Sequence, residues 1–245
     1  MKYHVKKGQV SYGEAVGILL IENFVPFIPG DVANASTYNY PVRFHRVPGI
    51  SVERIFNHDM TMLDEIMKAG KSLKKEGVRA ITSDCGFLAL FQSQLADALD
   101  IPVFMSSLMQ IPFILNIFGK NREIGIVTAN ADSLNREVFN AIGIDEKMTE
   151  RLKIGGLGKS EHFVSSVIKE DGMLDSELME METVEAALKL QRDNPSIGSI
   201  LLECSLLPPY GRAVQEATGL PVFDFITMID YVFSAVVKKQ YNGFM

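Results

Sequence analysis

Short apolar runs alternate with longer stretches of helical periodicity in the first half of the chain. Four such runs are expected to form strands, at residues 16–21, 42–47, 78–82 and 103–105. Apolar residues at three- and four-residue spacing predict amphipathic helices over residues 59–76 and 87–99. Gly77 directly follows the first of these helices and is a good signal for its end.

The second half of the chain repeats this plan. Strands are expected at residues 124–128, 152–154, 197–202 and 222–225. Apolar residues at helical spacing predict helices at residues 132–142, 161–168, 174–191, 210–217 and 228–239. Asn194 and Pro195 break the longest of these helices just before the third strand of this half.

Strands that alternate with helices of this length are typical of βαβ units, in which parallel sheets are covered by helices on both faces. Right-handed crossovers place the carboxyl ends of all strands at one edge, where ligands bind in open α/β sheets. We therefore expect an α/β fold of two pseudo-symmetric halves. Residues 1–115 plus 222–245 are expected to form lobe one, and residues 116–221 lobe two.

Composition and charge narrow the range of functions. Apolar residues make up 47% and charged residues 22%, as in an ordinary globular protein with a sizeable core. The net charge of −6 disfavours nucleic-acid binding through a basic face. No apolar stretch reaches the length of a membrane span, and no cleavage site for a secretory signal follows the short apolar run near the N-terminus. A cytoplasmic location with reduced thiols is expected.

The two cysteines occupy matching places in the two halves. Cys85 and Cys204 each follow an expected strand and each precede a proline, Pro102 or Pro221, by 17 residues. A helix N-terminus after each thiol is expected to stabilise the thiolate and lower its pKa. Two thiols that face each other across a cleft can remove a proton from one side of a carbon and return one from the other.

Less specific interpretations of the cysteines stay open at this point. Free cysteines are often simply buried in the core. A redox disulfide is another alternative. A metal site is disfavoured because the chain has no Cys-x-x-Cys pair and no cluster of histidines.

The strand-then-cysteine segments at residues 80–87 and 199–208, with the strand at 124–128, resemble the aspartate/glutamate racemase superfamily. These are cofactor-independent racemases that use two cysteines. In layout, the resemblance extends over nearly the whole chain. It implies two Rossmann-like lobes with parallel sheets flanked by helices, and an active site in the cleft between them. It also implies no pyridoxal phosphate, no metal and a homodimer.

The resemblance assigns roles to individual residues. Cys85 and Cys204 match the two catalytic cysteines. Thr128 matches a position that helps to hold a substrate carboxylate. Ser205 matches a position that is usually threonine, and Asn23 matches the polar residue after the first strand.

This chain also departs from the pattern of glutamate racemases. Those enzymes carry Cys-Asn-Thr where this chain has Cys85, Gly86 and Phe87, and Cys-Thr-His where it has Cys204, Ser205 and Leu206. Gly86 lets a substrate approach the backbone closely. Phe87 and Leu206 are expected to make the pocket more apolar.

The function that follows is that of an isomerase, an amino-acid racemase of the aspartate/glutamate type. Its thiol pair would exchange protons at the carbon next to the carboxylate of a small-molecule substrate, without a cofactor. Backbone N–H groups beside the thiols would stabilise the enolate-like intermediate. A hydantoin racemase, a maleate isomerase-like enzyme and a ligand-binding relative without turnover are the alternatives. Ala129 and Asn130 follow Thr128, where maleate isomerases usually have a tyrosine, and this argues mildly against that branch.

Overall fold

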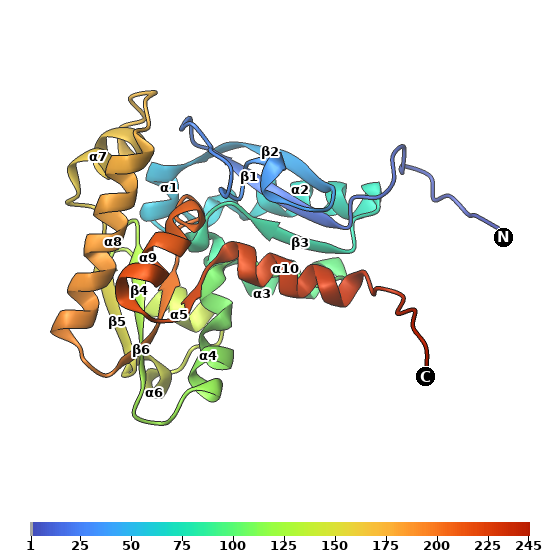
Figure 1. The fold of residues 1–245 in the computed structure, drawn as a ribbon. Coiled ribbons are helices and arrows are strands. Elements are labelled where there is room, and N and C mark those ends of the chain that lie inside the picture. Colours follow the sequence, from blue (N-terminus) through green and yellow to red (C-terminus); the bar gives the residue numbers. More distant parts are fainter. Residues whose placement is uncertain (1) are drawn as a thin grey trace.

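The computed structural model describes residues 2–245 and contains two parallel β-sheets flanked by helices (Figure 1). The first sheet has the order β2-β1-β3, formed by Val42–Ser51, Val16–Glu22 and Ala80–Ser83. The second has the order β5-β4-β6-β7, formed by Leu152–Gly156, Glu123–Thr128, Ile197–Leu202 and Val222–Phe223. Every strand pair is parallel, which confirms the predicted fold class.

The two sheets have equivalent strand orders. In each sheet the first strand of the half pairs with the second on one side and the third on the other. Beyond β3, a single parallel bridge joins Ile81 to Val103, at the place that β7 occupies beside β6. The strand expected at residues 103–105 is therefore reduced to this bridge. The matching order supports the interpretation of the chain as two related halves.

The helices connect these strands. The α-helices of the described residues are α1 Val52–Phe56, α2 Leu63–Glu76, α3 Gln92–Leu99, α4 Ile111–Ile117, α5 Arg136–Ala141, α6 Glu146–Thr149, α7 Glu161–Phe163, α8 Ser176–Asp193, α9 Gly211–Thr218 and α10 Phe225–Val236. A 3₁₀ helix, Gly86–Phe91, precedes α3, and a π-helical turn, Val164–Ile168, follows α7. As predicted, α2 ends at Gly77, whose φ of 100° is in the left-handed region that glycine favours. The sequence patterns missed α1, α4 and α6, all of them short.

The two halves share one core. Its largest cluster of buried side chains contains Leu19 and Ile81 from the first sheet together with Ile124 and Leu201 from the second. Burying such side chains stabilises the fold by about 25 cal/mol for each Å² removed from water. The carboxyl ends of β3 and β6 are consequently held close to each other.

The C-terminal segment divides between the two halves. Residues 222–245 are predicted to belong to lobe one, but β7 pairs with β6 through Ile200 and Val222 in the second sheet. Helix α10 returns to the first sheet, where it runs along β3 (Figure 1), and its Phe225 belongs to the same buried cluster as Val16. The division into two lobes otherwise stays a prediction. Among the helices described, none combines the length and hydrophobicity that crossing a bilayer requires.

Candidate active site

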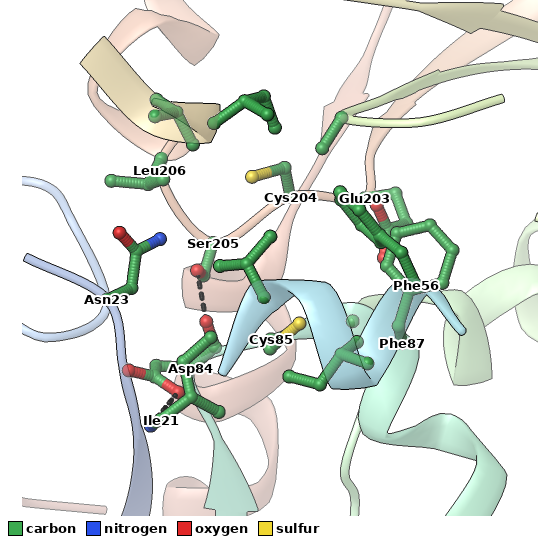
Figure 2. A pocket seen from close by; sticks show the side chains of 16 residues that line it. Ile21, Asn23, Phe56, Asp84, Cys85, Phe87, Glu203, Cys204, Ser205 and Leu206 are labelled. Carbon is green, nitrogen blue, oxygen red and sulfur yellow. Dashed lines mark hydrogen bonds between the residues drawn. The ribbon is translucent and has the colours of Figure 1, made fainter. Parts of the chain in front are cut away.

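A small pocket lies where β3 and β6 end, and both cysteines line it (Figure 2). Its volume is about 40 Å³, room for a few water molecules. A wider depression of about 440 Å³ shares Phe56, Ala129 and Ile168 with it and is also lined by Lys159. The depression adjoins the pocket and is bordered by the glycine-rich loop at residues 155–160.

The backbone around each cysteine has the same hydrogen bonds in both halves. The residue before the cysteine donates its N–H to the central strand, and the carbonyl of the cysteine accepts an N–H from three residues further on. In the first half, the N–H of Asp84 donates to the carbonyl of Leu19 at 3.0 Å, and the N–H of Leu88 donates to the carbonyl of Cys85 at 3.1 Å. In the second half, the N–H of Glu203 donates to the carbonyl of Val127 at 2.8 Å, and the N–H of Leu207 donates to the carbonyl of Cys204 at 3.1 Å. This repetition places the two thiols at equivalent positions, on opposite sides of the pocket (Figure 2).

The environment of the thiols differs from the expected one. Both cysteines are free and half-buried, and the sulfur of each accepts a backbone N–H, from Phe87 at Cys85 and from Leu206 at Cys204. Burial raises the pKa of both thiols, and the nearby Glu203 carboxyl raises each pKa further. The expectation of a lowered pKa is therefore wrong, because desolvation outweighs the N–H groups.

A buried carboxyl follows the last residue of β6. Glu203 is 0% exposed, and its Oε2 accepts a hydrogen bond from the Thr128 hydroxyl at 2.7 Å. Its Oε1 is buried without a hydrogen-bond partner. Burial raises the pKa of Glu203 to about 7. Gly86 is required beside it, since a Cβ built there would lie 1.8 Å from Oε1 and 2.9 Å from the carbonyl oxygen of Glu203.

The equivalent residue in the first half, Asp84, is also buried. Its Oδ1 accepts the backbone N–H of Ile21 at 3.0 Å, and burial raises its pKa to about 7. The Ser205 hydroxyl donates to the carbonyl of Asp84 and so ties the two cysteine loops together. Asn23 lies at the same end of the pocket, with its Oδ1 buried and without a partner (Figure 2).

Two aromatic rings lie at the Glu203 end of the pocket (Figure 2). Phe56, at the end of α1, meets Phe87 edge to face, with ring centroids 5.3 Å apart. Phe87 is almost completely buried, whereas Phe56 is half-buried at the pocket. The rings give this end an apolar wall with π faces.

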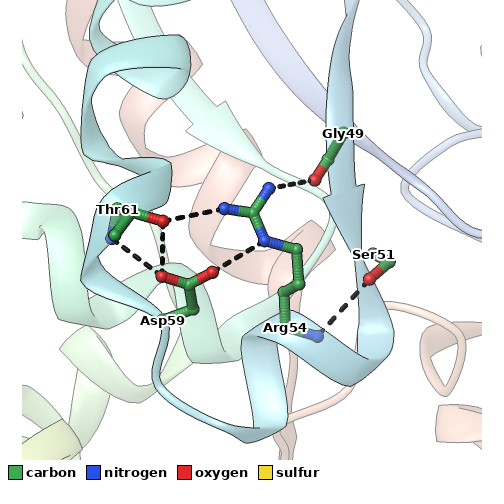
Figure 3. Close-up of polar contacts among 5 residues, drawn as sticks. All are labelled: Gly49, Ser51, Arg54, Asp59 and Thr61. Atoms are coloured by element: carbon green, nitrogen blue, oxygen red, sulfur yellow. Dashed lines mark hydrogen bonds and ion pairs between the residues drawn. The ribbon is translucent and has the colours of Figure 1, made fainter.

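Helix α1 is only five residues long, and a polar cluster around Arg54 holds it in place (Figure 3). Arg54 donates to Asp59 at 2.7 Å, to the Thr61 hydroxyl at 3.0 Å and to the carbonyl of Gly49. Ser51 caps the helix by accepting the N–H of Arg54 at 3.4 Å. The cluster joins α1 to β2 and to the start of α2, and thereby fixes the position of Phe56.

Most of the residues that the sequence selected come together here. Six of them line the pocket: Asn23, Cys85, Gly86, Phe87, Cys204 and Ser205. Thr128 is fully buried behind Glu203 and reaches the pocket only through that carboxyl. Asp84, Glu203 and Phe56 also line the pocket and were not among the residues predicted for the site. The only sequence signal for the carboxyls was an acidic residue next to each cysteine.

The two buried carboxyls make stability depend on pH. A carboxyl with a raised pKa stays protonated to a higher pH in the folded state than in the unfolded state. Its contribution to the free energy of unfolding is therefore complete near pH 4 and is lost as pH rises through 7. In wild type, ionisation of Glu203 is expected to lower the free energy of unfolding by about 3 kcal/mol as pH rises, and Glu203→Gln should not show this part of the decrease. Urea unfolding of wild type and variant at pH 5 and pH 8 measures the change in the free energy of unfolding between the two pH values. Equal losses in the two proteins would show that Glu203 ionises normally.

Comparison with known proteins gives relatives in sequence and in structure. The chain is 32% identical over 237 residues to a dimethylsulfoniopropionate lyase of Durusdinium sp. clade D, covering 94% of this chain and 77% of that protein. It is 32% identical over 238 residues to dimethylsulfoniopropionate lyase 7 of Emiliania huxleyi (strain CCMP1516), covering 94% of this chain and 69% of the lyase. No protein-family model matches the sequence.

Solved structures with the same fold include racemases. Allantoin racemase from Pseudomonas fluorescens aligns with a TM-score of 0.62 at 14% identity over 91% of both chains. Picrophilus torridus aspartate racemase aligns with a TM-score of 0.55 at 14% identity, over 94% of this chain and 96% of that one. The fold of the aspartate/glutamate racemase superfamily is thus confirmed, while the sequence relatives carry a different activity.

Proposed function

Because the chain belongs to the dimethylsulfoniopropionate lyase family, we propose that it is a lyase that cleaves dimethylsulfoniopropionate or a closely similar sulfonio carboxylate. The observation that carries the proposal is the chemistry of the pocket lining. It combines two thiols and two buried carboxyls with apolar walls, and among the described residues it includes no lysine, arginine or histidine. Such a pocket suits a small molecule with a positive end and an acidic C–H bond.

The proposed reaction is an elimination. A cysteine thiolate accepts the proton from the carbon next to the substrate carboxylate. The electron pair of that C–H bond forms the C=C bond, and the pair of the C–S bond leaves on sulfur. The products are acrylate, neutral dimethyl sulfide and a protonated thiol. The leaving group needs no proton, so a single base completes the chemistry.

The substrate itself would supply the positive charge that favours a thiolate. Burial raises the pKa of Cys85 and Cys204, which disfavours a thiolate before binding. A sulfonium cation in the pocket lowers the pKa of a neighbouring thiol, because opposite charges stabilise each other strongly where water is excluded. Backbone N–H groups next to the thiols and the amide of Asn23 are the candidate donors to the substrate carboxylate and the developing enolate.

Amino-acid racemase activity is the second candidate function. It is favoured by one observation, the placement of the two thiols on opposite sides of the pocket (Figure 2). Two-base exchange at an α-carbon needs this arrangement, whereas elimination needs only one base. In the lyase, the second thiol would stay protonated and serve as a hydrogen-bond donor to the substrate.

The lyase proposal is tested by incubating the purified chain with dimethylsulfoniopropionate. Dimethyl sulfide is measured by gas chromatography and acrylate by NMR. We expect both products in equal amounts, at a rate proportional to enzyme concentration. Absence of both, together with racemisation of aspartate or glutamate, would replace the lyase by the racemase.

A further inference from the structure

Glu203 has a carboxylate oxygen for which the fold provides no hydrogen-bond partner. Oε2 is held by the Thr128 hydroxyl at 2.7 Å, whereas Oε1 is buried without a hydrogen bond. An unpaired buried carboxyl oxygen destabilises the fold unless another group satisfies it. Glu203 is one of the residues that line the pocket, so a ligand bound there is the available partner.

The surroundings of this oxygen suit an onium group, a sulfur or nitrogen cation shielded by methyl groups. Such a cation has no N–H or O–H to donate, and it is bound through nearby negative charge and the faces of aromatic rings. Phe56 and Phe87 lie at the same end of the pocket as Glu203 (Figure 2), with ring centroids 5.3 Å apart. Gly86 leaves room for the carboxyl, because even a Cβ there would overlap Oε1.

The opposite end of the pocket has different chemistry. Asn23 and Ser205 lie there with Asp84, and the two thiols lie between the ends (Figure 2). The side-chain NH2 of Asn23 is a hydrogen-bond donor that can serve a carboxylate at this end. The order of chemical groups along this axis therefore matches a molecule with a carboxylate at one end and an onium group at the other.

We propose that Glu203, together with the ring of Phe56, recognises the onium group of the substrate and selects cationic over neutral carboxylates. The inference rests on the proposed lyase function and names its specificity-determining residue. The positive charge disappears from sulfur as the C–S bond breaks, so this contact stabilises the bound substrate more than the transition state. Glu203→Gln is therefore expected to raise KM more than it lowers kcat.

Asp84 is the natural rival for this role. It is the equivalent of Glu203 in the other half, it is buried, and it also lines the pocket. However, the Oδ1 of Asp84 accepts the N–H of Ile21 at 3.0 Å, and no aromatic ring lies beside it in Figure 2. Asp84→Asn is consequently the matched control for Glu203→Gln, since both changes remove one buried carboxyl and keep the size of the side chain.

The experiment measures binding by calorimetry and does not depend on turnover. Two ligands of the same shape are compared: 3-(trimethylammonio)propanoate, which carries the cation, and 4,4-dimethylpentanoate, in which carbon replaces the charged nitrogen. We expect wild type to bind the cationic ligand at least about tenfold more tightly. Glu203→Gln should bind the two ligands within about twofold of each other, with unchanged affinity for the neutral one. Asp84→Asn should keep the wild-type ratio.

Each other outcome overturns the inference. If wild type cleaves dimethylsulfoniopropionate but binds the two ligands equally well, onium recognition is contradicted and the lyase function is not. Loss of the ratio in Asp84→Asn instead of Glu203→Gln would assign the role to Asp84. Binding of neither ligand, with no cleavage, would overturn the lyase function and this inference with it. Should Glu203→Gln fail to fold, Phe56→Leu is measured in its place. Its preference for the cationic over the neutral ligand is expected to be about threefold smaller than that of wild type.

Discussion

Cys85→Ser and Cys204→Ser are each expected to reduce the cleavage of dimethylsulfoniopropionate severely. The variant that lacks the base should lose about a thousandfold or more in kcat, because a serine hydroxyl is far too weakly acidic to act as its alkoxide. The other variant should lose about a hundredfold, since its thiol supplies only a hydrogen bond to the reacting substrate. The readout is release of dimethyl sulfide at saturating substrate.

A control separates chemistry from folding in these variants. Serine has nearly the size of cysteine, and both cysteines are half-buried, so thermal unfolding should change little. Binding of 3-(trimethylammonio)propanoate should also stay close to that of wild type. Retention of more than a tenth of the activity by both variants would exclude the thiols from the reaction.

Gly86→Ala is the second change with a large expected effect. Its Cβ would lie 1.8 Å from Oε1 and 2.9 Å from the carbonyl oxygen of Glu203. The side chain of Glu203 can rotate away, but the carbonyl belongs to the loop that carries Cys204 and cannot. We expect a loss of about 1–3 kcal/mol in stability and about a hundredfold in kcat/KM, because the loop shifts relative to Cys85.

Gly211→Ala is the matched control for this change. Gly211 is also buried, but an added Cβ would lie 3.4 Å from its nearest neighbour, Asp224 Oδ2, which is ordinary contact. It begins α9, where alanine favours the helix by about 0.5–1 kcal/mol. Stability and activity close to wild type are expected. A Gly86→Ala protein that behaved like Gly211→Ala would show that the contact with Glu203 is not tight.

The sequence predicted most of the strands and the place of the cysteines at their carboxyl ends, because these depend on strong local patterns. Strands such as β4 and β6 consist mostly of apolar residues, and helices such as α2 have clear periodicity and a glycine at the end. The carboxyl ends of parallel strands then fall at a common edge by geometry alone. Cys85 and Cys204 had to lie there once the strands were assigned.

The parts of the site that were missed depend on tertiary contacts. Helix α1 is too short to show periodicity, and the Arg54 cluster holds it in place through Asp59, Thr61 and Gly49. Strand alternation does not predict the direction of the Glu203 side chain, because β6 ends at Leu202 and alternation does not extend past a strand end. Neither position is visible in local sequence.

The pKa of the thiols and the choice of substrate were also beyond the sequence patterns. Whether a helix N-terminus or burial controls a thiol depends on how much water surrounds it, which requires the packed structure. The racemase prediction came from the two matched cysteines and from the family resemblance of the segments around them, and one fold can support several activities. Isomerase activity, the homodimer and the cytoplasmic location stay predictions.

The most direct test of the proposed lyase function is one NMR experiment in D2O. The wild-type chain is mixed with equal concentrations of dimethylsulfoniopropionate, aspartate, glutamate and allantoin, and all signals are followed together. The lyase predicts that only the dimethylsulfoniopropionate signals decay, with acrylate appearing at the same rate. Decay of the α-proton signal of an amino acid, with dimethylsulfoniopropionate intact, would contradict it and establish the racemase.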